Sequence, residues 1–148
     1  MTFAERQAAV VQALEQVKAE MVQNMAKYGR NASFRSVASL HVEPHDNGAA
    51  LYGSANWETM QTGSRGYVAP AAIFDWSMYK GLSFATERER WSFSYAVAYN
   101  VRLFGTRLFQ SGKEQDIWTT AVERATRDLA KKLVEHTKME VSQITQKL

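Results

Sequence analysis

The sequence contains no cysteine, only 2 prolines and no long hydrophobic run. Without cysteine the chain has no disulfide, no thiolate metal ligand and no cysteine nucleophile. A transmembrane helix needs about 18 consecutive apolar residues, and because no such run occurs we expect no membrane-spanning segment. The first six residues, MTFAER, have neither the basic region nor the apolar stretch of a signal peptide, so we expect none.

Charge of one sign is also scarce. The chain carries 18 Lys and Arg against 15 Asp and Glu, a formal net charge of +3, which is far from the dense positive field of a dedicated nucleic-acid-binding protein. Hydrophobic residues make up 45% of the 148 residues and aromatic residues 11%. This composition supports a real core in one domain and leaves no room for two. We therefore expect residues 1–148 to form a single intracellular domain of the α-rich or α+β class.

The N-terminal segment is predicted to be a long amphipathic helix. Thr2 and Glu5 fit the S/T-x-x-E capping box, and Gly29 stands where a helix commonly needs a left-handed residue to end. Apolar residues recur between them at spacings of three and four, which places them on one helical stripe: Val10, Leu14, Val17, Met21, Met25 and Tyr28. This stripe packs either on the domain itself or on another subunit.

A small antiparallel sheet of about three to four strands is predicted next. Across residues 33–62 the hydrophobic period changes to two, as in half-buried strands. The turn signal at 46–48 indicates a hairpin whose return strand covers 49–54, and 57–62 is interpreted as a third strand. Pro44 cannot donate a ladder hydrogen bond, so we expect it at a strand end or on an edge.

Three more helices are predicted in the second half of the chain. Pro70, suited to a first helical turn, and Gly81 bound a short helix. A second capping box at 86–89 opens a helix that ends at Gly105. Because apolar residues lie nearly all round this helix, we expect it to be the central, buried one. A long last helix is expected from about Lys113 to near the C-terminus.

The end of that last helix carries a narrow apolar seam in polar surroundings. Val134, Val141 and Leu148 are seven residues apart, and Ile144 lies between them. A seam of this kind suits a helix that meets a partner. Two interpretations stay open: residues 134–148 are a projecting interface helix, or they are a terminal segment that frays.

We find no motif of enzyme chemistry in the sequence. There is no nucleophile elbow, Walker A loop or HExxH pattern. His41, Glu43 and His45 would share one strand face, as metal ligands can, but Pro44 interrupts the strand and no further ligand is near. His136 and Glu140 are interpreted as a surface pair. We expect no enzyme, metal, cofactor or small-molecule substrate.

Two segments are distinctive as units. The first runs from Gly63 through Pro70 to a helix of the form Ile73-x-x-Trp76-x-x-x-Lys80-Gly81, and the second is the Ala-rich segment 96–104 followed by Gly105-Thr106-x-Leu108-Phe109. Together they resemble the tail-component or neck family of tailed bacteriophages and prophages. The order of the predicted elements resembles the family over residues 1–130, and the amino-acid sequence itself is similar between residues 63 and 109.

This resemblance implies a structural virion protein without catalytic residues, assembled in the host bacterial cytoplasm. Members form a ring, which we expect to be a hexamer or dodecamer, that joins portal or head-closure proteins to the tail. Genome DNA passes through the lumen without specific contacts. Aromatic and Arg side chains commonly dominate protein–protein contacts, so we expect the interface at Trp57, Gly63, Arg65, Gly66, Tyr67, Pro70, Arg107, Leu108, Phe109, Val134, Val141, Ile144 and Leu148.

Two other functions stay open from the sequence. An unrecognised enzyme would depend on His41, His45 and His136, and their joint replacement by Ala would then abolish an activity. A small nucleic-acid-binding accessory domain would use the mild positive charge instead. Phosphate neutralisation predicts affinity that falls steeply with salt. The purified chain would then be retained on a heparin or DNA column at low salt, and passage without retention would exclude this alternative.

Overall fold

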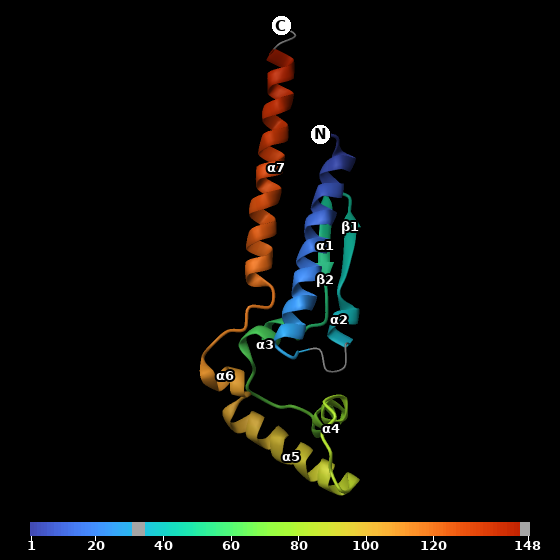
Figure 1. The fold of residues 1–148 in the computed structure, drawn as a ribbon, viewed down its shortest axis with the longest axis vertical. Coiled ribbons are helices and arrows are strands. Elements are labelled where there is room, and N and C mark those ends of the chain that lie inside the picture. Colours follow the sequence, from blue (N-terminus) through green and yellow to red (C-terminus); the bar gives the residue numbers. More distant parts are fainter. Residues whose placement is uncertain (31–34, 146–148) are drawn as a thin grey trace.

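The computed structural model describes residues 1–30 and 35–145 and shows an elongated α+β molecule (Figure 1). In the described residues no helix is long and apolar enough to cross a membrane. The elements follow one another as α1 (Phe3–Lys27), α2 (Arg35–Ser39), β1 (His41–His45), β2 (Gly48–Tyr52), α3 (Trp57–Thr62), α4 (Pro70–Tyr79), α5 (Glu87–Phe104), α6 (Arg107–Ser111) and α7 (Thr119–Thr145).

Helix α1 lies between α7 on one side and the β1–β2 hairpin on the other (Figure 1). Its predicted capping box is confirmed, since the Thr2 hydroxyl accepts from the Glu5 amide and the Glu5 carboxylate accepts from the Thr2 amide. These hydrogen bonds lower the pKa of Glu5 below its ordinary value. The stability that the cap contributes is therefore fully present at pH values above the ordinary carboxyl pKa, and it is lost as the pH falls through the lowered pKa. Gly29, with φ of 64°, follows the helix end as predicted.

The hydrophobic core is small and sits where these three layers meet. Its centre comprises Val17 and Met21 of α1, Leu40 before β1, and Ala121 of α7. Half-buried side chains pack around it, namely Val22, Leu51, Trp57, Trp118 and Ala125. The long N-terminal and C-terminal helices predicted from sequence are thus confirmed, and they form the frame of this end of the molecule.

The sheet is smaller than predicted. In residues 1–30 and 35–145 it has two antiparallel strands, with His41 opposite Tyr52 and His45 opposite Gly48. The expected third strand at 57–62 is helix α3, because its first and fifth residues, Trp57 and Gln61, both point into the interior at helical spacing. Residues 35–39 are also helical, and the predicted strand start at 33–34 lies outside the described residues.

Helix α5 is not the central, buried helix that its composition predicted. It lies at one end of the molecule and packs against α4 (Figure 1). Only Ser94 and Ala98 on it are buried. A helix with apolar groups all round can be buried by other elements of its own chain or by another protein. In this chain α4 covers only one side of α5. The ends of α4 and α5 agree with the sequence, at Pro70, Thr86 and Gly105.

Helix α7 begins at Thr119, six residues after the predicted start, because Gln61 holds the preceding segment out of helix. The buried Gln61 side chain accepts from the Ile117 amide at 3.2 Å and the Trp118 amide at 3.3 Å, and it donates to the Thr119 hydroxyl at 2.7 Å. Its carbonyl accepts from the Gln115 amide at 2.8 Å. This Gln61 clamp fixes α3 against the start of α7.

Replacing Gln61 by Leu is expected to lower the free energy of unfolding by about 2–4 kcal/mol. The change leaves the buried Ile117 amide without its acceptor, and an unsatisfied buried group costs about 1–3 kcal/mol. Urea unfolding monitored by circular dichroism measures the difference. The control is Gln23→Leu on the exposed side of α1, expected to stay within about 0.5 kcal/mol of the parent chain. Equal stability of the two variants would contradict the clamp.

Candidate protein–protein interface

The chain exposes more surface than a compact protein of its mass. Its accessible surface is 10300 Å², whereas folded monomers of 16.8 kDa average about 7,700 Å². The excess is about 2,600 Å² and includes many large apolar side chains, among them Tyr67, Trp76, Met78, Tyr79, Tyr95, Tyr99 and Phe104. Exposed apolar surface that forms contiguous patches marks interaction sites, so these residues are candidates for such a site.

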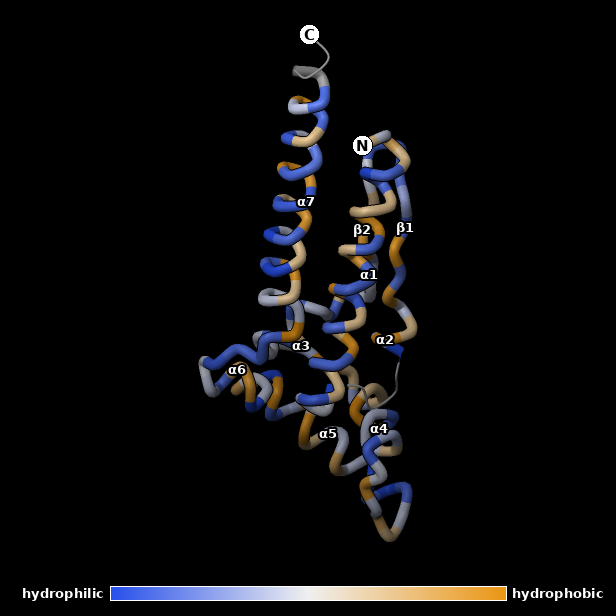
Figure 2. Tube along the Cα trace, turned by 45° about the horizontal axis from the view of Figure 1, so that its top comes forward, coloured by the Kyte–Doolittle hydropathy of each residue, from blue (hydrophilic) through white to orange (hydrophobic). Residues whose placement is uncertain are grey.

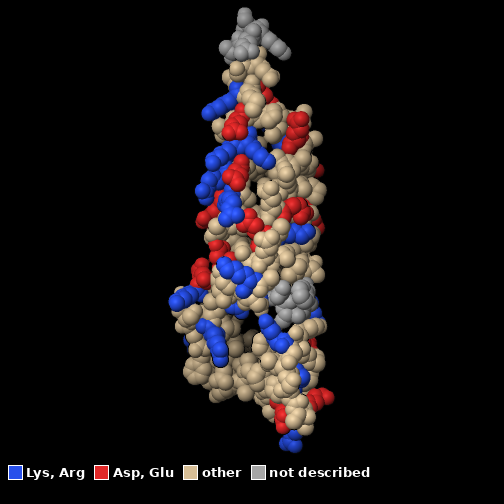
Figure 3. All heavy atoms as spheres, in the orientation of Figure 1, with Lys and Arg blue, Asp and Glu red and all other residues tan. Residues whose placement is uncertain are grey.

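One face of α5 is exposed and carries no charge between Arg88 and Arg102, which lie on the same side of the helix at its two ends. It consists of Ser92, Tyr95, Ala96, Tyr99, Asn100 and Leu103, which follow one another at helical spacing. Tyr95 is 61% exposed, Tyr99 63% and the adjoining Phe104 59%. The hydropathy colouring shows apolar residues along α5 at this end of the molecule (Figure 2). Charged side chains of both signs cluster along α7 and at the opposite tip, and in the region between this view shows several basic side chains and few acidic ones (Figure 3).

The helix pair that presents this face is held by a half-buried arginine. Arg90 donates to the buried Ser77 hydroxyl at 2.8 Å and to the Leu82 carbonyl at 3.0 Å. Its guanidinium lies over the rings of Phe74 and Phe84, 5.7 and 4.9 Å from their centroids. Each of these contacts links α5 to α4 or to the turn after it. The α5 face is therefore presented in a fixed geometry, as an interface surface should be.

Two of the segments predicted as interface sites lie together in the structure. The loop that begins at Gly63 meets the turn between α5 and α6: the Thr106 amide donates to the Ser64 carbonyl at 2.8 Å, and the Thr106 hydroxyl accepts from the Ser64 amide at 3.2 Å. A side chain at Gly63 would collide with the Phe109 backbone, and one at Gly105 with the Phe109 ring. These five residues form what we call the glycine junction.

The rest of the predicted loop is more open. Arg65 is exposed, Gly66 has φ of 141° with open space around it, and Tyr67 is 78% exposed. Pro70 begins α4 and is half-buried. In the short helix α6, which the sequence did not predict, Arg107 and Phe109 are exposed and Leu108 is half-buried. The exposed residues of the loop and of α6 thus extend the exposed surface from the α5 face toward the middle of the molecule.

Trp57 lies in a different environment from the other candidates. Its indole packs against the core cluster and against Gly53, in an apolar cleft of about 290 Å³ that Leu40, Leu51 and Trp118 also line. The indole nitrogen is buried without a hydrogen-bond partner. The half-buried ring therefore contributes to packing within the domain, and its predicted contact with a neighbouring protein stays a prediction.

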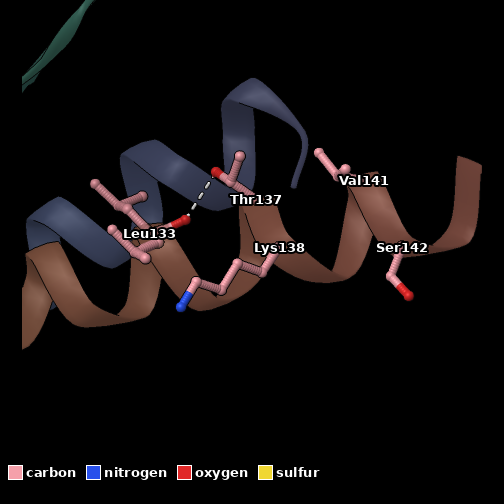
Figure 4. Close-up of a pocket in the computed structure, with 6 residues that line it drawn as sticks. Leu133, Thr137, Lys138, Val141 and Ser142 are labelled. Atoms are coloured by element: carbon pink, nitrogen blue, oxygen red, sulfur yellow. Dashed lines mark hydrogen bonds between the residues drawn. The ribbon is translucent and has the colours of Figure 1, made fainter. Parts of the chain in front are cut away.

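The predicted seam on α7 is exposed as far as the structure describes it. Val134 is 52% and Val141 57% exposed, and both line a shallow groove with Leu133, Thr137, Lys138 and Ser142 (Figure 4). Ile144 is within α7, but its side chain is outside the described part, as is Leu148. The helix continues past the level at which α1 begins (Figure 1). The Met1 amino group pairs with Glu140, so α7 stays beside the start of α1 as far as residue 140 and extends beyond it only after that.

The histidines form surface contacts. His41 lies 3.0 Å from Glu43, and His45 lies 3.1 Å from the Tyr52 hydroxyl, on the outer face of the hairpin. His136 Nδ1 is 3.7 Å from the Glu140 carboxylate on α7. Among residues 1–30 and 35–145 we find no group of three or more acidic or His side chains placed to hold a metal ion.

Sequence reasoning missed the tyrosines of the α5 face. The signal was present, because Tyr95 and Tyr99 are four residues apart on a helix that is apolar all round. That pattern was interpreted as burial inside the domain. Comparison of the chain with protein-family models, curated proteins and solved structures yields no match. The function is therefore argued from these surfaces.

We expect Gly63→Ala to lower the free energy of unfolding by about 2–4 kcal/mol. Gly63 has φ of 78° and ψ of −178°, a region that essentially only glycine occupies, at a cost of about 1–3 kcal/mol for other residues. The added methyl would also lie 2.6 Å from the Thr106 hydroxyl. Gly48→Ala, at a position with open space, serves as the control and is expected to be near neutral. Similar thermal unfolding of both variants would refute the glycine junction.

Proposed function

We propose that this chain is a structural virion protein of a tailed phage: a subunit of a homo-oligomeric ring in the neck, or head–tail connector. In this role it binds portal, head-closure or tail proteins and further copies of itself, and the genome passes through the ring. The observation that carries the proposal is the exposed aromatic face of α5 around Tyr95 and Tyr99, which has no charged residue between Arg88 and Arg102. The likeness of residues 63–109 to the neck family supplies the class of protein.

The physical argument starts from how little the isolated chain buries. Burying apolar surface is favourable by about 25 cal/mol per Å². A helix face of two turns without charge does not gain this free energy while it stays in contact with water. The Tyr side chains on it are of the type that dominates binding energy in protein interfaces, because their rings are apolar and their hydroxyls form hydrogen bonds. Covering this face with another protein therefore favours assembly.

The arrangement of the surfaces also suits a component that bridges two neighbours. The α5 face lies at one end of the long axis, and the exposed seam of α7 lies at the other end (Figure 1). A chain with separate docking surfaces at its two ends can bind another neck protein through α5 and an adjacent copy through α7. Contacts between unlike surfaces of successive copies are what closes a ring.

The decisive experiment compares phage particles made with and without this chain, from the genome that encodes it. We expect the chain in purified particles by mass spectrometry, and we expect its deletion to yield separate capsids and tails with loss of DNA from the capsids. Particles that lack the chain and still join capsid to tail would overturn the proposal, as would the absence of the chain from purified virions.

The double variant Tyr95→Glu/Tyr99→Glu tests the face itself. Two buried, unpaired carboxylates cost several kcal/mol, so incorporation into particles is expected to fall at least about tenfold, while the folded monomer keeps its circular dichroism spectrum. The matched control, Ala19→Glu/Gln23→Glu, adds two acids at the same spacing on exposed α1 positions. It is expected to incorporate normally. Full incorporation of the Tyr variant would show that another surface makes the contact.

A further inference from the structure

We infer that successive copies in the ring meet through the outer face of the hairpin on one copy and the exposed stripe of α7 on the next. This inference rests on the proposed ring and names the two unlike surfaces that build it. The occupant of the hairpin face is a second copy of this chain. The hairpin contributes His41, Glu43, His45 and Tyr52, and α7 contributes Arg127, Lys131, Val134 and Lys138.

The hairpin face is ordered before any partner binds. His41 stacks on Tyr52 with ring centroids 5.5 Å apart, and His45 meets the same ring edge-on at 6.1 Å. Glu43 accepts a hydrogen bond from His41 on the same face, with about half of each side chain exposed. Such a patch offers an aromatic platform and one carboxylate at little cost in side-chain entropy.

The α7 face has the complementary character. Arg127, Lys131, Val134 and Lys138 follow one another at spacings of four, three and four, so they share one side of the helix. All four are exposed, on the side away from α1. Lys and Arg side chains pack their aliphatic stems on apolar surface while their charged ends reach a carboxylate. They also bind the faces of aromatic rings, which Tyr52 provides.

Charge favours this pairing of unlike surfaces over pairing of like ones. Residues 36–64, which contain the hairpin, carry Glu43, Asp46 and Glu58 and no Lys or Arg. Residues 127–138 of α7 carry four basic side chains against two acidic ones. Hairpin against hairpin brings acids together, and α7 against α7 brings bases together. Hairpin against α7 brings opposite charges together, which selects the correct partner surface.

The placement of the two surfaces allows a closed ring. The hairpin and the first half of α7 lie at the same level on either side of α1 (Figure 1). The stripe begins in this half with Arg127 and Lys131 and continues into the second half with Val134 and Lys138. Each copy can therefore bind one neighbour on each side, as a head-to-tail ring requires. The lengths also agree, because a five-residue strand covers about 17 Å and the rise along a helix from Arg127 to Lys138 is about 17 Å.

The exposed area is sufficient for two such contacts per copy. A stable interface of standard size buries about 800 Å² on each partner, so a ring subunit with two neighbours buries about 1,600 Å². This chain exposes about 2,600 Å² more than a compact protein of its mass. The α5 face can therefore stay available for other proteins of the neck.

Thiol cross-linking tests the inference without background, because the chain has no cysteine. We would place Asn47→Cys in the exposed hairpin turn and Ala130→Cys beside the α7 stripe, and treat the oligomer, isolated from solution or from particles, with a short bis-maleimide. The double variant is expected to give a ladder of products that stops at the size of the ring. Each single variant is expected to give none.

A charge exchange supplies the second measurement. Glu43→Lys alone and Lys131→Glu alone each place like charges together, so each is expected to lower the cross-linked yield at least about tenfold, and the two together are expected to restore it. Dimers from a single-cysteine variant would overturn the inference in favour of a symmetric contact. An oligomer without the ladder would overturn it and leave the proposed ring intact. If no oligomer forms in solution or in particles, the proposed ring itself fails.

Discussion

The structure depends on one polar junction between its two ends. Gln61 holds the start of α7, and two residues later Gly63 begins the loop that is hydrogen-bonded to Thr106. The α1–hairpin–α7 layer lies on one side of this point and the α4–α5 pair on the other. Elsewhere between the two ends, Lys80 donates to the Gly29 carbonyl at 2.8 Å and Arg35 donates to the Tyr79 hydroxyl at 3.2 Å. Directional hydrogen bonds therefore set how the two apolar parts are oriented.

A junction of this kind compensates for a small core. Each end has its own buried cluster, around Met21 in one and around Ser77 and Arg90 in the other. Neither end surrounds its helices completely, and apolar side chains remain in contact with water on α5 and α7.

The sequence was most informative where the determinants of structure are local. The cap at Thr2, the helix starts at Pro70 and Thr86 and the end at Gly105 were all predicted correctly, since a cap needs only its neighbours within one turn. The sequence failed where the outcome depends on distant contacts. Segment 57–62 was predicted as a third strand, and its hydrogen bonds with residues 115–119 show why it is helical.

The candidate site was predicted in part, for a related reason. The loop from Gly63 and the segment from Arg107 were chosen separately, and the structure shows that Gly63 and Phe109 pack together. The face of α5 was missed, because an all-round apolar helix looks the same in sequence whether its cover comes from its own chain or from another. That distinction requires the whole fold, which shows α5 at the end of the molecule with α4 on one side only.

The exposed face of α5 has a consequence for the chain before it is assembled. Two free copies at high concentration can bury their tyrosines against each other, and such pairs are withdrawn from productive assembly. The number of free chains must therefore stay close to the number of docking places as these are formed. In the proposed role, the timing of synthesis would therefore matter to assembly as much as the affinity of any single contact.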